Sequence, residues 1–196
     1  MARSLAALAA VLAAGLAGCG GSSPPQPAGT TTPRETNDRR PPLPPGWRRV
    51  VNVQAGYSLG IPPGWTARGG PGSTLVRSRD RALAVSVTAD RSPQGRRLPP
   101  AGYALRTARA LRGYGGLRVG GAGRVPGSHY PAAAVEARGT YRRTRVRQDI
   151  RVIALQRRGR VTFTLVAFRN ATVAGGIYRA AVDEMVRTFR GQAPGL

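Results

Sequence analysis

Apolar and polar side chains alternate with a period of two in five segments of the chain. This pattern is typical of strands that bury one face and expose the other. In the fourth segment, for example, Val146, Ile150 and Val152 alternate with arginine residues. The predicted strands are residues 57–61, 83–88, 135–142, 145–152 and 161–167. Arg157-Arg158-Gly159 separates the last two and predicts a hairpin turn.

Two further segments repeat their apolar residues with helical spacing. The clearer one covers residues 177–189, with Thr172 or Asn170 as candidates to cap its start. A weaker helix is predicted to begin near Pro99-Pro100 and to end at the glycine-rich stretch 113–116. Because groups of strands alternate with single helices, the pattern predicts an α+β fold in which an antiparallel β-sheet is packed with helices.

The N-terminus has the pattern of a secretory signal, because Arg3 precedes an apolar stretch from Leu5 to Leu16. The segment Leu16-Ala17-Gly18-Cys19 resembles the lipobox of bacterial lipoproteins. The resemblance implies cleavage before Cys19, a diacylglyceryl group on its thiol, and a place on the extracytoplasmic face of the cell membrane. Two acyl chains suffice for stable anchoring. The alternative is an ordinary signal peptide that contains a cysteine by chance.

Residues 20–46 are rich in Pro, Ser, Thr and Gly and contain almost no large apolar side chains. Such a segment cannot bury enough surface to offset the entropy lost on ordering, so we expect a disordered tether. The predicted organisation is a signal peptide at 1–18, the lipidated cysteine and tether at 19–46, a globular domain at 47–191 and a tail at 192–196.

Two short motifs flank this domain. Residues 57–65 run Tyr-Ser-Leu-Gly-Ile-Pro-Pro-Gly-Trp, and the last predicted helix ends in Thr188-Phe189-Arg190. Both motifs resemble those of PsbP-like domains, a family that includes photosystem-associated PsbP proteins and actinobacterial LpqN-type lipoproteins. The resemblance implies an α/β/α sandwich over about residues 50–190. It also implies a non-catalytic role as an assembly factor, accessory subunit or partner-binding module, with no family-wide active site.

The charge is extreme, with 31 basic residues against 8 acidic ones and a net charge of +23. Every basic residue is arginine, whose guanidinium group stays charged and grips phosphate or carboxylate through two parallel hydrogen bonds. If residues 135–142 pair with residues 145–152, they form a basic sheet surface. Its predicted members are Arg138, Arg142, Arg143, Arg145, Arg147 and Arg151.

This surface has two interpretations. It is either a solvated face in an arginine-rich composition or a docking surface for an anionic partner. Outside the cell the candidate partners are anionic lipid headgroups, anionic wall polymers and acidic proteins, in addition to the membrane that the anchor reaches. Nucleic acid is not expected, because the chain is predicted to be exported and lacks stacking aromatics between its basic residues.

The chain has one cysteine and one histidine, so it has too few ligands for a Cys/His zinc site and no possible internal disulfide. No cofactor or metal is predicted. Asp183 and Glu184 are expected on the solvated face of the last helix. Ser128 and His129 are adjacent and leave open an envelope hydrolase with a site near His129, although no nucleophile elbow is present. We therefore predict a non-enzymatic binding or accessory domain, with the hydrolase or a purely structural envelope component as alternatives.

Overall fold

The computed structural model describes residues 42–157 and 161–191. The predicted signal peptide, Cys19, the tether up to residue 41, the centre of the predicted hairpin turn at 158–160 and the tail at 192–196 lie outside these residues. At the start of the described part, Leu43 lies against Gly60, and the Trp47 N–H donates to the Pro44 carbonyl.

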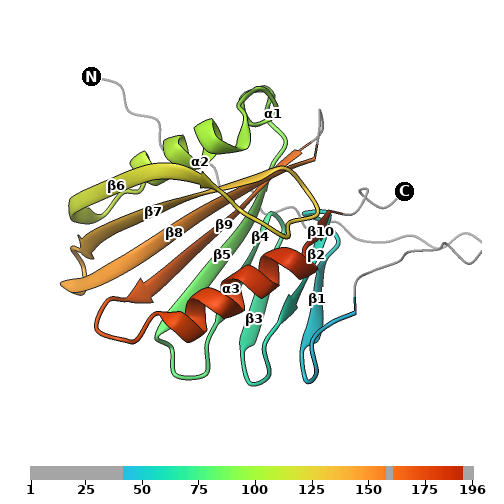
Figure 1. Ribbon diagram of the computed structural model, residues 1–196, viewed down its shortest axis with the longest axis horizontal. Coiled ribbons are helices and arrows are strands. Elements are labelled where there is room, and N and C mark those ends of the chain that lie inside the picture. The colour runs from blue at the N-terminus through green and yellow to red at the C-terminus, as the bar shows by residue number, and fades with distance from the viewer. Residues whose placement is uncertain (1–41, 158–160, 192–196) are drawn as a thin grey trace, which may run out of the picture. The chain divides into compact units, whose positions relative to one another are not determined.

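A seven-stranded sheet dominates the domain, and every neighbouring pair in it is antiparallel (Figure 1). Its order across the sheet is β3 (Thr66–Gly70), β4 (Ser73–Arg77), β5 (Leu83–Asp90), β9 (Val161–Asn170), β8 (Val146–Arg157), β7 (Ala132–Tyr141) and β6 (Tyr114–Arg124). The predicted pairing of the segments 135–142 and 145–152 is confirmed, because β7 pairs with β8. The predicted hairpin is also confirmed at its flanks, where Arg157 pairs with Val161.

A smaller sheet holds β1 (Arg48–Asn52), β2 (Tyr57–Ile61) and β10 (Arg190–Gly191), with β2 at its centre. All five residues of β2 are buried, although their alternation predicted only one buried face. The reason is that Leu43 and Thr188 cover Gly60 on the side away from the main core. The β2 strand is therefore covered on both faces.

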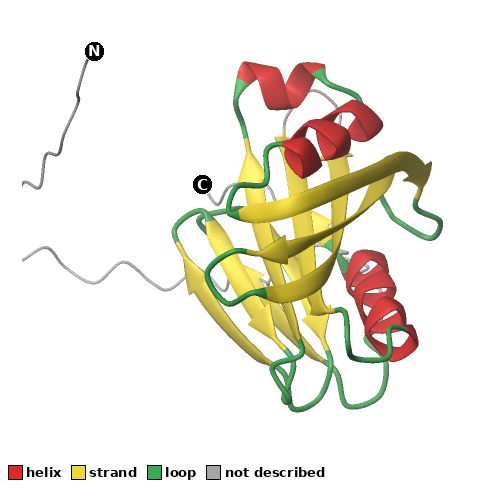
Figure 2. Ribbon diagram, turned by 90° about the vertical axis from the view of Figure 1, so that its left-hand side faces the viewer, coloured by secondary structure: helices red, strands yellow, loops and turns green. Residues whose placement is uncertain are grey.

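Helices cover both faces of the large sheet, as Figures 1 and 2 show. The short α1 (Pro93–Arg97) leads into α2 (Pro100–Arg109), and α2 packs over β6, β7 and β8. On the other face, α3 (Gly176–Thr188) packs on the main core. The β8 side chains alternate accordingly, since Val152 faces the α2 cluster and Ile153 the α3 cluster. The predicted α+β class is confirmed at this level.

The end of α3 is joined to β2 by contacts between the two motifs noted in the sequence. The Gly60 N–H donates to Thr188 Oγ1 at 3.0 Å. The ring of Phe189 stacks on Tyr57 at a centroid distance of 5.5 Å, and Phe163 meets both rings edge-on. All three rings are fully buried, so they form the aromatic centre of the main core.

The glycine-rich segment after α2 forms the long strand β6. Two sequence-based expectations about α3 are not met. The predicted caps of α3 are wrong, because the helix begins at Gly176 and Asn170 Oδ1 instead accepts the Thr172 N–H. Ile177, expected to be buried, is 81% exposed in the first turn of α3.

Candidate anion-binding groove

A groove of about 710 Å³ lies between the first turns of α3 and the adjoining part of the large sheet. In Figure 1, α3 crosses in front of the sheet, and the ends of β7 and β8 extend past its start. Six arginines and two carboxylates line the groove. They are Arg118, Arg138, Arg147, Arg151, Arg169, Arg179, Glu136 and Asp149. The lining therefore carries an excess of four positive charges.

The strand register explains why these side chains meet. Four residues on four neighbouring strands are cross-strand partners of one another in turn. In order across the sheet they are Arg118 on β6, Arg138 on β7, Asp149 on β8 and Arg169 on β9. Cross-strand partners project to the same face of a sheet, so the four side chains form one row. Because neighbouring strands lie about 4.8 Å apart, the row spans ~14 Å.

Asp149 is the hub of this row. Its carboxylate accepts hydrogen bonds from Arg138 and from Arg169, which stand on either side of it. The side chain of Asp149 is only 18% exposed, so the ion pairs are partly shielded from water. The hydrogen bond to Asp149 raises the pKa of Arg138 above its ordinary value. Asp149 therefore holds two arginines of the predicted basic face and its neighbouring strand in one cluster.

A second row runs parallel to the first, through Glu136, Arg151 and Ala167. Arg151 is 12% exposed and donates from Nη1 to Asp183 of α3 at 2.6 Å. Its Nε lies 3.3 Å from Glu136, within ion-pair range, yet this buried N–H makes no hydrogen bond in the described part of the chain. Asp183 therefore does not lie on a solvated helix face as expected, because it anchors α3 to the sheet.

Arg169 is held in place by the start of α3. Its guanidinium also donates to the Val173 carbonyl in the loop before the helix. A Cβ atom at Gly175 would come within 3.0–3.2 Å of this guanidinium, so a larger residue there would have to push the guanidinium aside by a few tenths of an ångström. The first turn of α3 has neither a side-chain cap nor an acidic residue, which leaves the positive end of the helix dipole uncompensated beside the groove.

Two of the groove arginines differ from the others. Among residues 42–157 and 161–191, the structure gives the guanidinium groups of Arg118 and Arg147 no hydrogen bond or ion pair, and both residues are exposed. The remaining four are engaged with Asp149, Glu136 or Asp183. Arg118 and Arg147 are thus the positive groups that the protein's own carboxylates leave available.

The hydrophobic core beneath the groove is covered. Leu83, Ala167 and Val182 lie beneath it but are only 2–4% exposed. Tyr178 forms part of the wall, where its hydroxyl donates to Asp80. This hydrogen bond raises the pKa of Tyr178. A molecule that enters the groove therefore meets guanidinium groups and arginine methylenes, and it does not reach the hydrophobic core.

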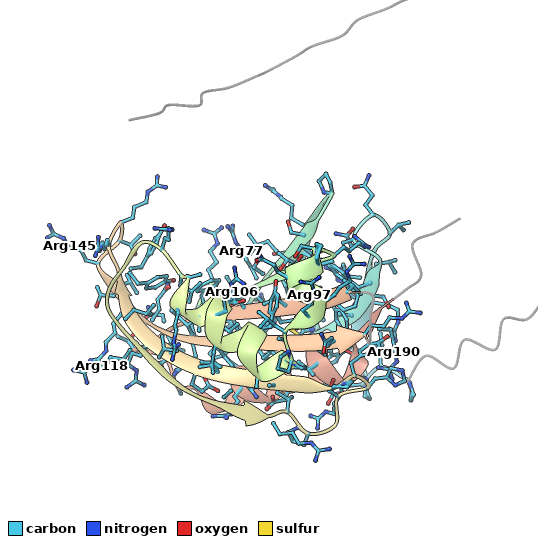
Figure 3. The ribbon with its side chains drawn as sticks, turned by 90° about the horizontal axis from the view of Figure 1, so that it is seen from above. Arg77, Arg97, Arg106, Arg118, Arg145 and Arg190 are labelled. Carbon is cyan, nitrogen blue, oxygen red and sulfur yellow. The ribbon has the colours of Figure 1, made fainter. Side chains whose placement is uncertain are left out.

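The predicted basic surface is divided by the fold. Arg138, Arg147 and Arg151 line the groove, whereas Arg142, Arg143 and Arg145 lie in the exposed turn between β7 and β8 and do not. Figure 3 shows Arg145 at the strand ends, apart from Arg118. Three further members, Arg118, Arg169 and Arg179, were missed. Arg169 continues the alternation of the fifth predicted strand, which was ended too early, at Ala167.

Positive charge alone does not distinguish the groove. Figure 3 shows Arg77, Arg97, Arg106 and Arg190 at other places around the domain. The groove differs from these places because its arginines line a concavity and four of the six are paired with carboxylates.

Ser128 and His129 lie in an exposed segment between β6 and β7. Ser128 Oγ accepts the Tyr130 N–H, and the His129 ring packs edge-on against Tyr130. Burial, with a smaller contribution from the charge of Arg190, lowers the pKa of His129. Over the described ranges neither side chain contacts a carboxylate, so a Ser-His-acid constellation is not assembled there.

In the described part of the chain, no group of three or more metal-ligating His, Cys, Asp or Glu side chains is present. Within the same residues no helix has both the length and the hydropathy needed to span a membrane.

Comparison with known proteins identifies similar folds only. No protein-family model matches the sequence, and no curated protein matches it significantly. A solved structure of a Bacteroides thetaiotaomicron protein aligns with a TM-score of 0.52 and 12% identity, over 77% of this chain and 50% of that protein. This chain therefore matches half the length of the Bacteroides protein. Mog1p of Saccharomyces cerevisiae aligns with a TM-score of 0.50 and 9% identity, over 74% of this chain and 95% of Mog1p.

Proposed function

We propose that the protein is a lipid-anchored lipoprotein of the extracytoplasmic membrane face. Its domain acts as a non-catalytic binding or accessory module that docks an anionic partner in the groove. The observation that carries the proposal is the lining of six arginines against two carboxylates, with Arg118 and Arg147 left unpaired among the described residues. Free guanidinium groups in a concavity favour an anion that accepts several hydrogen bonds at once.

A PsbP-like fold is part of this proposal. The two motifs that resemble that family contact each other through Gly60 and Thr188 and through the rings of Tyr57 and Phe189. Both motifs therefore serve the packing of the domain, which is compatible with a family that shares a fold and no active site. Mog1p, which has a similar fold, is a Ran-binding protein, and a partner-binding role for the present domain is of the same general kind.

The anchor and the groove have separate tasks in this proposal. Acylation of Cys19 would hold the domain at the membrane without any help from its arginines. The groove is then available for partner capture or orientation at the surface. The candidate partners remain an anionic lipid, an anionic wall polymer and an acidic protein.

The test is a comparison of two doubly substituted proteins that lose the same charge. Arg118→Gln with Arg147→Gln removes the two unpaired groove arginines, and Arg109→Gln with Arg112→Gln removes two exposed arginines at the end of α2, on the opposite face of the sheet. Binding to envelope extract and to anionic vesicles is measured at several salt concentrations.

The groove pair is expected to weaken binding by about tenfold, and the α2 pair is expected to have a much smaller effect. Equal losses from both pairs would mean that binding follows net charge, and the groove would then have no special role. Substitution of Arg143 and Arg145 in the β7–β8 turn should resemble the α2 pair, because neither residue lines the groove.

A further inference from the structure

The shape of the groove restricts its occupant. Arg151 and Arg169 line the groove and are only 12% and 19% exposed, because α3 and the loop before it cover them. A flat bilayer surface or the face of a folded protein does not reach such groups. A flexible chain does reach them, because it follows the row of arginines that runs ~14 Å across four strands spaced about 4.8 Å apart.

The closed floor restricts the occupant further. Leu83, Ala167 and Val182 present 2–4% of their surface, so an acyl chain in the groove would not reach the apolar core beneath it. The interactions on offer are charge-assisted hydrogen bonds from guanidinium groups. An occupant with anionic groups along its length therefore makes the most use of these donors.

The directions of the donors favour phosphate over carboxylate. A planar carboxylate matches a single guanidinium fork, whereas the tetrahedral oxygens of a phosphate accept donors from several directions. In this groove the donors come from the edge strand through Arg118, from the middle of the sheet through Arg147 and Arg169, and from helix α3 through Arg179.

We infer that the groove binds an extended chain of phosphodiester groups, and that Asp149 and Glu136 are internal competitors that occupy guanidinium groups until the chain displaces them. The inference rests on the proposed docking function and names its ligand. Asp149 holds Arg138 and Arg169, and Glu136 lies within ion-pair range of Arg151 and Arg179. In the bound state, phosphate oxygens take over part of this pairing.

If Asp149 competes with the ligand for guanidinium groups, its removal should raise the affinity for a polyanion more than the removal of another carboxylate does. Replacing any single carboxylate of the protein by an amide raises its affinity for a polyanion slightly, because the electrostatic potential of the whole protein becomes more positive. Removal of the Asp149 charge also frees two guanidinium groups in the groove. Asp149→Asn should therefore tighten binding several-fold more than Glu184→Gln, which removes a carboxylate paired with Arg187 on α3.

The experiment measures binding of poly(glycerol phosphate) oligomers to the wild type and to four variants by calorimetry or fluorescence, between about 50 and 200 mM salt. The variants are Arg118→Gln with Arg147→Gln, Asp149→Asn, Glu136→Gln and Glu184→Gln. Glu136→Gln is included because Glu136 is 54% exposed and its replacement disturbs the fold less than loss of Asp149. Thermal unfolding checks that each variant is folded.

The wild type should bind the oligomers at least about tenfold more tightly than poly-glutamate of equal charge, since the donors suit phosphate. The Arg118/Arg147 variant should reduce the salt dependence of the logarithm of the binding constant by about one unit per arginine. Asp149→Asn and Glu136→Gln should bind more tightly than the wild type, and Glu184→Gln should change little.

The outcomes separate the inference from the proposed function. If the Arg118/Arg147 variant binds envelope extract as the wild type does, the groove is not the docking site and both proposals fail. If that variant loses binding but poly-glutamate competes as well as the phosphodiester chain, the docking function stands and the ligand class is wrong. If both acid-to-amide variants bind equally or more weakly than the wild type, the competitor role is wrong.

Discussion

The ion pair between Arg151 and Asp183 should be worth more to stability than a surface ion pair, because it joins α3 to the sheet from a nearly buried guanidinium. Arg151 is 12% exposed, Asp183 is 35% exposed, and the Nη1–Oδ1 distance is 2.6 Å. A hydrogen bond to a charged group contributes about 1.5–3 kcal/mol. Since a third of the Asp183 side chain is exposed to water, we discount this to ~1–2 kcal/mol for Asp183→Asn.

The loss of stability expected for Asp183→Asn also depends on the charge of Arg151, which the substitution leaves nearly buried. After loss of the Asp183 charge, the ion-pair partner left to Arg151 among the described residues is Glu136, which lies 3.3 Å from Nε without a hydrogen bond. For a domain of this size, 1 kcal/mol corresponds to about 2–4 °C in the melting temperature, so Asp183→Asn should lower it by ~2–8 °C. Arg151→Met should be milder, because Asp183 can then be solvated.

The assay is a double-mutant cycle by urea unfolding with Arg151→Met, Asp183→Asn and both together. The free energies should be non-additive by about 1 kcal/mol or more, since either single change already breaks the pair. Glu184→Gln is the matched control. Glu184 is on the same helix and pairs with Arg187, which is 52% exposed, so this change should cost under about 0.5 kcal/mol. Additive effects, or equal losses from Asp183→Asn and Glu184→Gln, would refute the structural role of the pair.

Two further predictions concern hydrogen bonds outside the groove. Thr188→Val should lower the free energy of unfolding by about 1–3 kcal/mol, because it leaves the buried Gly60 N–H without its acceptor. Chemical denaturation measures this free energy, and a loss below about 0.5 kcal/mol would contradict the prediction. The hydrogen bond from Ser78, followed by those from Tyr178 and the backbone of Ala82, lowers the pKa of Asp80 to about 2. A depressed pKa means that this contribution to stability is present above the unfolded pKa near 4 and is lost as the pH falls through about 2. Carboxyl NMR titration should show the Asp80 pKa rise toward its ordinary value in Ser78→Ala, and an unchanged midpoint would show that Ser78 is not the main cause.

The sequence predicted those elements whose periodicity is long enough to detect. The strands around Val85, Ile150 and Phe163 and the helix around Met185 were all expected and are all present. The short strands β1, β3 and β4 were not expected. They have five residues each, like β2, but none of them places three large apolar residues at alternate positions as β2 does, so tertiary pairing rather than local pattern makes them strands.

The error over Arg143 and Arg145 has a local cause. The turn between β7 and β8 contains no Gly, Pro, Asn or Asp, so it lacks the residues that usually indicate a turn. Arg145 adopts a positive φ of 57°, a conformation that non-glycine residues seldom take and that sequence does not announce. The predicted face was therefore extended past the end of the strand.

The groove itself depends on long-range pairing that one sequence does not show. Arg118 and Arg169 are 51 residues apart and lie in one row only because β6, β7, β8 and β9 pair in the observed register. Asp183 joins the site because α3 crosses the sheet beside β8. The residue types suggested anion binding, and the register determined which arginines take part.

The clearest test of the docking site is an NMR titration of the arginine Nε–Hε signals with a short poly(glycerol phosphate) oligomer. The signals of Arg118 and Arg147 should shift first and saturate together, while those of Arg109 and Arg112 at the far end of α2 should stay nearly constant. Shifts spread evenly over all exposed arginines, or confined to residues outside the groove, would contradict a specific site between α3 and the sheet.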